Sequence, residues 1–223
     1  MAIQLDLLNS IPYFQGLSRP ELEDIRNVIF EKKAERNDIV LTEGDPSTAL
    51  LFLVSGALKL FKTSSEGKEQ ILRILRPGEA VNDVSIFDEG PNFTSAQAMC
   101  PAVLYGIDAR RLKAMMDKYP AIAGNSRRIL AQQVRHLGTL VEDLSFKPVI
   151  GRVAKILLEY ARETPGPRPR LTQQEMAAMA GTAREVVGRS LKALEEEGAI
   201  RLEHNRLVVE NRKALEDIVA AFS

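Results

Sequence analysis

The sequence is poor in the residues that build redox, metal and covalent catalytic sites. Its 223 residues include no tryptophan, two histidines and one cysteine. The single cysteine, Cys100, excludes an internal disulfide and any site made from several cysteines of one chain. With two histidines, no clustered carboxylates and no metal-ligand spacing, the sequence predicts neither an enzyme nor a metal site.

Long hydrophobic runs are missing as well. No run approaches the roughly 20 apolar residues that a helix needs to cross a bilayer. The first residues, MAIQLDLLNSIPYFQG, lack the basic start and apolar stretch of a signal peptide. We therefore expect a cytoplasmic protein with no membrane partner.

The chain has no excess of either charge. Thirty Lys and Arg residues balance thirty Asp and Glu residues, so the formal net charge is +0. Binding to nucleic acid would therefore need a local basic patch. The 45% hydrophobic content is enough for one large domain or two small ones with their own cores.

Residues 39–108 alternate between short apolar runs and turns that contain glycine. The runs are IVLT, ALLFLV, ALKLFKT, QILRIL, SAQAM and VLYGI. Short strands at a spacing of about 8–12 residues are typical of an all-β roll or barrel. Before them, Ser18 and Glu21 have the spacing of a capping box and predict a helix that includes LEDIRNVIF.

The periodicity becomes helical over residues 109–146. Pro120 suits the first turn of the longer of two helices there. Leucines recur every seven residues along it, with polar Gln133 as an interruption, and further apolar residues widen the stripe. The stripe consists of Leu130, Val134, Leu137, Leu140, Val141 and Leu144. It predicts a coiled-coil seam with a partner; the alternative is that the helix packs on its own roll, and one face could serve each role.

Residues 147–223 form a smaller unit. The segment PVIGRVAKILLEYARE predicts an amphipathic helix, and the proline-rich PGPRPR at 165–170 predicts a loop. A helix then begins after Thr172, with Glu175 at the capping-box position, and stops at Gly181. A second helix follows in TAREVVGRSLKALEEEG, then a short hairpin in AIRLEHNRLVV and a final helix in NRKALEDIVAAF. Two helices joined by a tight turn, with a hairpin behind, predict a winged helix-turn-helix.

The second of these helices has two chemically different faces. On a helical wheel Val187, Leu191 and Leu194 fall on the side expected to be buried. The opposite side carries Glu185, Arg189 and Lys192, with Arg184 on its flank. Arginine matches the two acceptors of guanine in the DNA major groove, and glutamate can accept from cytosine. The alternative is that Glu185 forms an ordinary ion pair with Arg189, or a capping box with Thr182.

Nearly the whole chain resembles the CRP/FNR superfamily of transcription regulators. The resemblance rests on GRVAKILLEYA, LTQQEMAAMAG and TAREVVGRSLKALEEEGAI, and upstream on the run from EGDPSTALLFLVSG to RPGEA. It implies an α+β fold. The three parts are a sensor β-roll of the cyclic-nucleotide-binding type over residues 1–108, helices that include a dimerisation helix over 109–146, and a winged helix-turn-helix over 147–223. The dimer seam would be formed by Leu130, Leu137, Leu140 and Leu144.

The resemblance also implies a homodimer that binds double-stranded DNA. Arg184, Glu185 and Arg189 match the R-E-x-x-x-R pattern with which the cyclic-AMP receptor branch reads a TGTGA half-site in a palindrome. Phosphate contacts would come from Gln173, Thr182 and Lys192. Ala183 stands where the branch has a serine, which removes one such contact. The 165–170 loop is a candidate contact for RNA polymerase, and a hinge is expected near residues 146–148.

The effector cassette departs from the family pattern. The family has G-E-L/I followed by R-[ST]-A, whereas this sequence has VNDVSIF and PNFTSAQA. The corresponding pocket residues here are Asn82, Asp83, Val84, Asn92, Phe93, Thr94, Leu137 and Gly138. Asn92, or Phe93 or Thr94 in a shifted alignment, replaces the arginine that neutralises the phosphate. Leu137-Gly138 replaces the polar pair that contacts the purine. We therefore expect an effector other than cyclic AMP.

The identity of that effector stays open. The chain lacks the N-terminal cysteine cluster of the iron–sulfur branch. Haem bound through His136 or His204 is one alternative, and a redox switch at Cys100 is another. The remaining alternatives are a different small molecule in the roll, no ligand at all, or a ligand-binding roll without a DNA function.

Overall fold

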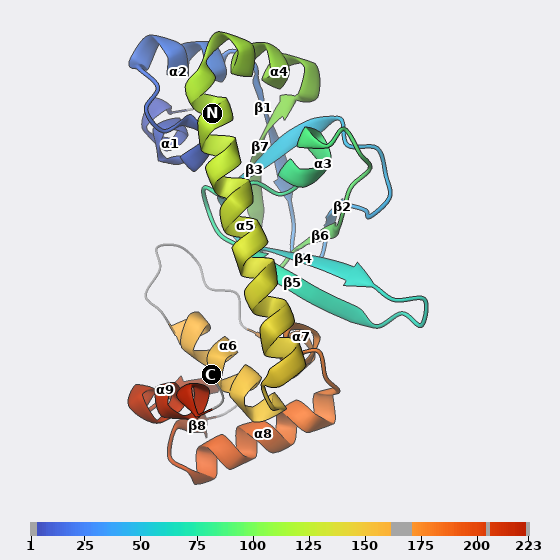
Figure 1. Cartoon of the computed structure of the whole chain (residues 1–223), viewed down its shortest axis with the longest axis vertical. Coiled ribbons are helices and arrows are strands. Elements are labelled where there is room, and N and C mark those ends of the chain that lie inside the picture. Colours follow the sequence, from blue (N-terminus) through green and yellow to red (C-terminus); the bar gives the residue numbers. More distant parts are fainter. Residues whose placement is uncertain (1–3, 162–170, 204–205, 222–223) are drawn as a thin grey trace. The chain divides into compact units, whose positions relative to one another are not determined.

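The computed structural model describes residues 4–161, 171–203 and 206–221 (Figure 1). The chain divides into two compact units, and the division falls inside one long helix. Among the described residues, the first unit contains 4–62 and 72–136. The second contains 63–71, 137–161, 171–203 and 206–221.

Two antiparallel sheets form the predicted roll. One has the order β1-β7-β3, made by Ile29–Ala34, Ala102–Asp108 and Ala49–Ser55. The other has the order β2-β6-β4-β5, made by Ile39–Leu41, Ser95–Ala98, Leu58–Thr63 and Glu69–Leu75. Alternate residues face the interior because side chains on a strand point to opposite faces. Leu53, Leu58, Leu75 and Leu104 are completely buried there.

Helices precede and interrupt the strands. Before the roll come α1 (Leu5–Ser10), the short 3₁₀ helix η1 (Pro12–Phe14) and α2 (Arg19–Arg26). The predicted capping box is present, since the backbone N–H of Ser18 donates to Glu21 Oε2 at 2.6 Å. The turn after β5 holds a short helix, α3 (Asp83–Phe87).

The helix predicted to include LEDIRNVIF is shorter than expected. It ends at Arg26, and residues 29–34 form strand β1 instead. Ile29 pairs with Ile107 and Phe30 pairs with Gly106 of β7. The ladder with β7 satisfies the backbone of these residues, so tertiary pairing overrides the helical pattern that precedes them.

Two further helices follow the roll, namely α4 (Ala109–Lys118) and α5 (Pro120–Phe146). Pro120 is the first residue of α5, as predicted. Asp108 caps α4 by accepting a hydrogen bond from the backbone N–H of Arg110 at 2.9 Å. In its first part α5 buries Ile122 and Ser126 against the first unit.

The second unit contains the predicted winged helix-turn-helix. Its elements are α6 (Val149–Ala161), α7 (Gln173–Ala180), α8 (Arg184–Glu196), β8 (Ile200–Glu203), β9 (Arg206–Val209) and α9 (Arg212–Ala220). The core of this unit is a single apolar cluster that includes Val153, Ala177, Leu191 and Leu215. The predicted loop at 165–170 lies outside the described residues.

The turn between β3 and β4 depends on Gly56. Its φ of +92° lies in the left-handed region, and a Cβ built there would stand 2.6 Å from the carbonyl oxygen of Pro101. We expect Gly56→Ala to lower the free energy of unfolding. The left-handed backbone conformation should cost alanine about 1–2 kcal/mol, and the close contact with Pro101 should add to this loss. Thermal or urea unfolding measures the change.

Gly67 supplies the matched control. Its φ is +78°, but a Cβ there would meet nothing within 4 Å. Gly67→Ala should therefore lower the free energy of unfolding only by the cost of placing alanine in a left-handed backbone conformation. Equal losses for the two variants would show that the approach of Pro101 does not matter.

Candidate functional site

The first helix of the helix-turn-helix, α7, begins at a capping box and ends at a glycine. Thr172 Oγ1 accepts from the backbone N–H of Glu175 at 3.1 Å, and Glu175 Oε2 accepts from the backbone N–H of Thr172 at 2.7 Å. Gly181 ends α7 with a φ of +61°, and the N–H of Thr182 donates to the carbonyl of Ala177 at 3.1 Å. This left-handed cap turns the chain directly into α8.

Helix α8 has the two faces that its sequence predicts. Val187, Leu191 and Leu194 are at most 1% exposed. Arg184, Glu185, Arg189 and Lys192 are all exposed. The buried face determines the outward face because α8 is a regular helix of about 3.6 residues per turn.

The two alternatives for Glu185 do not match the structure. Across the described residues, no ion pair or hydrogen bond joins Glu185 to Arg189. The N-cap of α8 is Ala183, which provides no side-chain hydrogen bond. Thr182 therefore does not cap α8, and the three side chains that match the R-E-x-x-x-R pattern remain available to a partner.

The predicted phosphate contacts surround this helix. Gln173 is exposed at the first position of α7. Its Oε1 is 3.8 Å from the position that a Cβ on Gly188 of α8 would take. Thr182 is half-buried in the turn, and Lys192 is exposed one turn beyond Arg189. Behind α8, the antiparallel pair β8–β9 forms the wing, and Arg201 makes an ion pair with Glu210 at 2.7 Å.

The joint between α5 and α6 is where the sequence predicts a hinge. Residues 147 and 148 separate the two helices. Lys147 Nζ lies 2.9 Å from Asp143 Oδ1, and Lys155 Nζ also donates to this carboxylate. Burial opposes ionisation of Asp143, but hydrogen bonds from Lys155 and Lys147 outweigh it and lower its pKa.

In the effector region, Asn82 braces the fold. It is 6% exposed, and both ends of its amide are occupied. Its Oδ1 accepts from the N–H of Leu51 at 3.1 Å, while its Nδ2 donates to Ser47 Oγ at 2.8 Å and to the carbonyl of Ala49 at 2.9 Å. The amide at this position therefore holds the start of α3 against β3.

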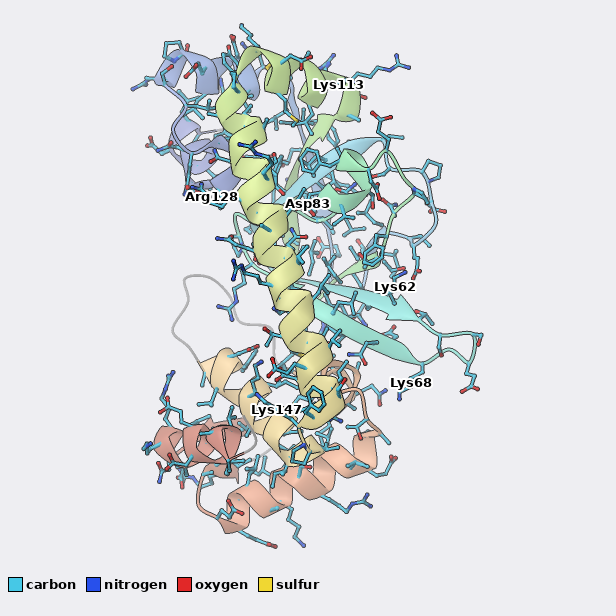
Figure 2. The ribbon with its side chains drawn as sticks, in the orientation of Figure 1. Lys62, Lys68, Asp83, Lys113, Arg128 and Lys147 are labelled. Atoms are coloured by element: carbon cyan, nitrogen blue, oxygen red, sulfur yellow. The ribbon has the colours of Figure 1, made fainter. Side chains whose placement is uncertain are left out.

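Asp83 is buried and internally bonded. It is 3% exposed, and it lies beside α5 in Figure 2. Gln133 Nε2 of α5 donates to its Oδ2 at 2.6 Å, and the hydroxyl of Tyr13 donates to the same oxygen. The N–H of Val84 donates to Oδ1 at 3.0 Å. Burial, and then the nearby charge of Asp83, raise the pKa of Tyr13, so its hydroxyl stays a donor.

Tyr13 and Gln133 were not predicted as members of this region. One signal was present in the sequence, since Gln133 is the polar residue that interrupts the apolar stripe. Tyr13 gave no such signal, because it lies 70 residues from Asp83 and only the fold brings them together.

The residues that we expect at the position of the family's arginine carry no charge. Asn92 is 3% exposed and donates through Nδ2 to the carbonyl of Thr42 at 3.1 Å. Phe93 is 47% exposed, and Lys62 Nζ lies 4.5 Å from its ring centre. Lys62 is paired with Glu43 at 2.5 Å. Val84, which follows Asp83, and Thr94, which follows Phe93, are both half-buried.

The remaining candidates for sensing are placed as follows. Leu137 and Gly138 are exposed on α5. His136 is exposed, and its Nε2 lies 3.3 Å from the carbonyl oxygen of Leu72. Cys100 is half-buried with a free thiol. His204 lies outside the described residues. Among the residues that the structure does describe, no group of three His, Cys, Asp or Glu side chains could hold a metal ion.

The apolar residues of α5 separate into two sets. Val134, Leu137 and Val141 are 70%, 38% and 64% exposed, respectively, and with half-buried Leu130 they form what we call the α5 stripe. Leu140 and Leu144 are half-buried. A Cβ on Gly181 would stand 2.7 Å from Leu144 Cδ2, so Leu144 packs against the turn of the helix-turn-helix in its own chain.

A two-sheet roll, a long helix and a helix-turn-helix with an exposed charged face are the parts of a DNA-binding transcription regulator. Two family models match the chain. A cyclic nucleotide-binding domain matches residues 31–119, and a Crp-like helix-turn-helix domain matches residues 151–218. No helix in the part of the chain that the structure describes is long and apolar enough to cross a membrane.

Several known proteins are similar to this chain over almost its full length. The cyclic AMP receptor protein of Thermus thermophilus is 35% identical over 208 residues, which is 93% of this chain and 96% of the relative. A CRP-like cAMP-activated global transcriptional regulator of Mycobacterium tuberculosis is 30% identical over 94% of this chain and 97% of its own. The crystal structure of the Thermus thermophilus catabolite activator protein matches with a TM-score of 0.55 and 32% identity, over 95% of this chain and 100% of that one. The chain belongs to the CRP/FNR family of transcription regulators, which are not enzymes.

The start of α8 can be improved, because its N-cap residue has no capping side chain. Ala183 has the extended backbone of an N-cap, with φ −85° and ψ 151°. We expect Ala183→Ser to raise the free energy of unfolding by about 1 kcal/mol. Thr172→Ala, which deletes the cap of α7, should lower it by about 0.5–2 kcal/mol. Urea unfolding of both variants checks this, and a serine variant no more stable than the parent would contradict it.

Proposed function

We propose that this protein is a homodimeric transcription regulator that reads a TGTGA-like palindrome in double-stranded DNA. The observation that carries the proposal is that Arg184, Glu185 and Arg189 are exposed on the outward face of α8 and have no side-chain partner among the described residues. Charges that the described part of the fold leaves unpaired are suited to a partner of opposite and patterned charge.

The residue types favour base reading over general attraction to phosphate. Each arginine can donate two parallel hydrogen bonds to guanine O6 and N7. Glu185 can only accept, and the N4 amino group of cytosine is a donor in the major groove. A carboxylate among DNA phosphates is unfavourable unless it meets such a donor. Glu185 between two arginines therefore supports a sequence-specific contact.

Groups around α8 would position this helix on the DNA duplex. We assign Gln173, Lys192 and the turn at Thr182 to phosphate oxygens, which set the orientation of the helix without reading sequence. In a twofold dimer the two recognition helices would enter major grooves about 34 Å apart. We also propose RNA polymerase as a partner through the loop at 165–170, and a cytoplasmic location.

The dimer would form along α5. The α5 stripe exposes three branched or long apolar side chains in a row, at positions that follow a heptad spacing. A contiguous exposed apolar row marks an interaction site, and in the commonest oligomers, twofold homodimers, the same patch of both copies meets. The occupant that we assign to it is therefore a second copy of this chain.

For the effector, we propose a small molecule other than cyclic AMP. The matched domain is of the cyclic nucleotide-binding type, which supports ligand binding in the roll. In the proposed alignment a neutral residue, Asn92 or Phe93, takes the place of the family's arginine. Lys62 Nζ lies 4.5 Å from the Phe93 ring but is already paired with Glu43, and a buried phosphate that lacks a free cation is costly. The carboxylate of Asp83 is already bonded to protein donors.

Removal of Glu185 tests base reading. We expect Glu185→Ala to relax discrimination at one base pair of each half-site by about 1–3 kcal/mol, because the cytosine amino group loses its acceptor. Fluorescence anisotropy with duplexes that carry every single substitution in the half-site measures this. An unchanged preference at all positions would remove Glu185 from base reading.

Lys192 gives the contrasting variant on the same face. Lys192→Ala should weaken binding to all duplexes alike and reduce the slope of log affinity against log salt by about 1. If Lys192→Ala instead changed the preferred base, the roles that we assign to the two residues would be wrong.

A charge in the α5 stripe tests the dimer. We expect Leu137→Glu to shift the protein toward monomer in sedimentation experiments, since it places a carboxylate in each copy at an apolar contact. Thr139→Glu is the matched control, because Thr139 is exposed on the opposite side of the same helix. A monomeric control variant, or a dimeric Leu137→Glu, would show that the stripe is not the interface.

A further inference from the structure

The buried carboxylate of Asp83 connects the effector region to the long helix. It accepts from Gln133 of α5 at 2.6 Å and from Tyr13 of η1, which precedes the roll. Three segments that are far apart in the sequence therefore meet at the carboxylate of Asp83, a residue that is 3% exposed. Charge-assisted hydrogen bonds in such surroundings are stronger than neutral ones at the surface.

A second anchor lies on the same helix. Asn125 Nδ2 donates to the carbonyl oxygens of Tyr13 at 3.1 Å and Gln15 at 2.8 Å. Asn125 and Gln133 are eight residues apart, or about 12 Å along the helix. Two hydrogen-bonded points at different heights hold both the position and the rotation of this part of α5 on the first unit.

The rotation of α5 about its axis matters because Gln133 lies among the residues of the α5 stripe. Gln133 precedes Val134 and lies three residues after Leu130 and four before Leu137. Residues at these spacings are neighbours on a helix surface. A turn of α5 about its axis at Gln133 would therefore move the stripe away from the direction in which it now faces solvent.

We propose that Asp83 is a positioning residue for the dimer, which holds Gln133 and so sets the rotation at which the α5 stripe meets a second copy. The inference rests on the proposed function, because it assumes that the stripe is the dimer interface. It also specifies a route for regulation: a ligand that competes for Oδ2 of Asp83 would displace Tyr13 or Gln133, and loss of the Gln133 hydrogen bond would loosen α5.

The test compares a lost donor with a retained one. In Gln133→Met the side chain keeps its length but cannot donate, whereas Gln133→Lys keeps a donor for the carboxylate. Gln132→Met is the matched control, since Gln132 is exposed on the neighbouring position of α5. All variants are made in the full chain, and circular dichroism confirms that each is folded.

Sedimentation gives the dimer dissociation constant, and anisotropy gives affinity for the TGTGA palindrome. We expect Gln133→Met to raise the dimer dissociation constant about tenfold and to weaken DNA binding in parallel, which is the loss expected for one charge-assisted hydrogen bond. Gln133→Lys and Gln132→Met should both stay close to the parent protein. If only packing at position 133 matters, methionine will be tolerated better than lysine, and that order overturns the inference.

Two further outcomes separate the inference from the proposed function. A parent protein that is dimeric and binds the palindrome, together with a Gln133→Met variant equal to it, overturns the inference alone. A parent protein that is monomeric and binds no palindrome overturns the proposed function and the inference with it. If Gln133→Met does not fold, Asp83→Asn carries the test, because it removes the charge but keeps an acceptor; a dimer dissociation constant equal to the parent value would then overturn the inference.

Discussion

The burial of one face of α8 is the constraint on which the DNA-binding half depends. Val187, Leu191 and Leu194 are packed into the core of the second unit, and a regular helix has no freedom to rotate once that face is buried. The outward position of Glu185 and Arg189 follows from this packing. The cap at Thr172 and the left-handed Gly181 then determine where α8 begins.

In the first unit, buried polar side chains bond to other groups of the same chain. The hydrogen bonds of Asn82 and Asp83 go to Leu51, Ser47, Tyr13 and Gln133. Buried polar groups require partners, and here the fold supplies them. Asn82 and Asp83 are thus satisfied within the chain, and their hydrogen bonds join α3 to β3, to the segment before the roll and to α5.

Much of the site could be predicted because its signals are local. Capping boxes at Ser18 and Thr172, the proline that starts α5 and the glycine that ends α7 each act within a few residues, and the structure has all four. The two faces of α8 follow from helical spacing in the same way. The prediction was wrong for Ile29 and Phe30, which begin β1 instead of ending a helix, because their partners Ile107 and Gly106 in β7 lie far away in the sequence. The N-cap at Ala183, one residue later than Thr182, depends on how tightly the turn closes.

Local patterns were enough to predict the β-roll, the long helix, the winged helix-turn-helix, the family and the exposed face of α8, since these rest on periodicity, on turn residues and on motifs of adjacent positions. Three facts follow from the folded chain alone: Glu185 has no partner among the described residues, Leu144 packs against its own chain, and Asp83 accepts from both Tyr13 and Gln133. These three facts concern contacts between segments far apart in the chain, or the absence of a contact between near ones. These contacts depend on how side chains pack in three dimensions, which the spacing of residues along the sequence does not predict.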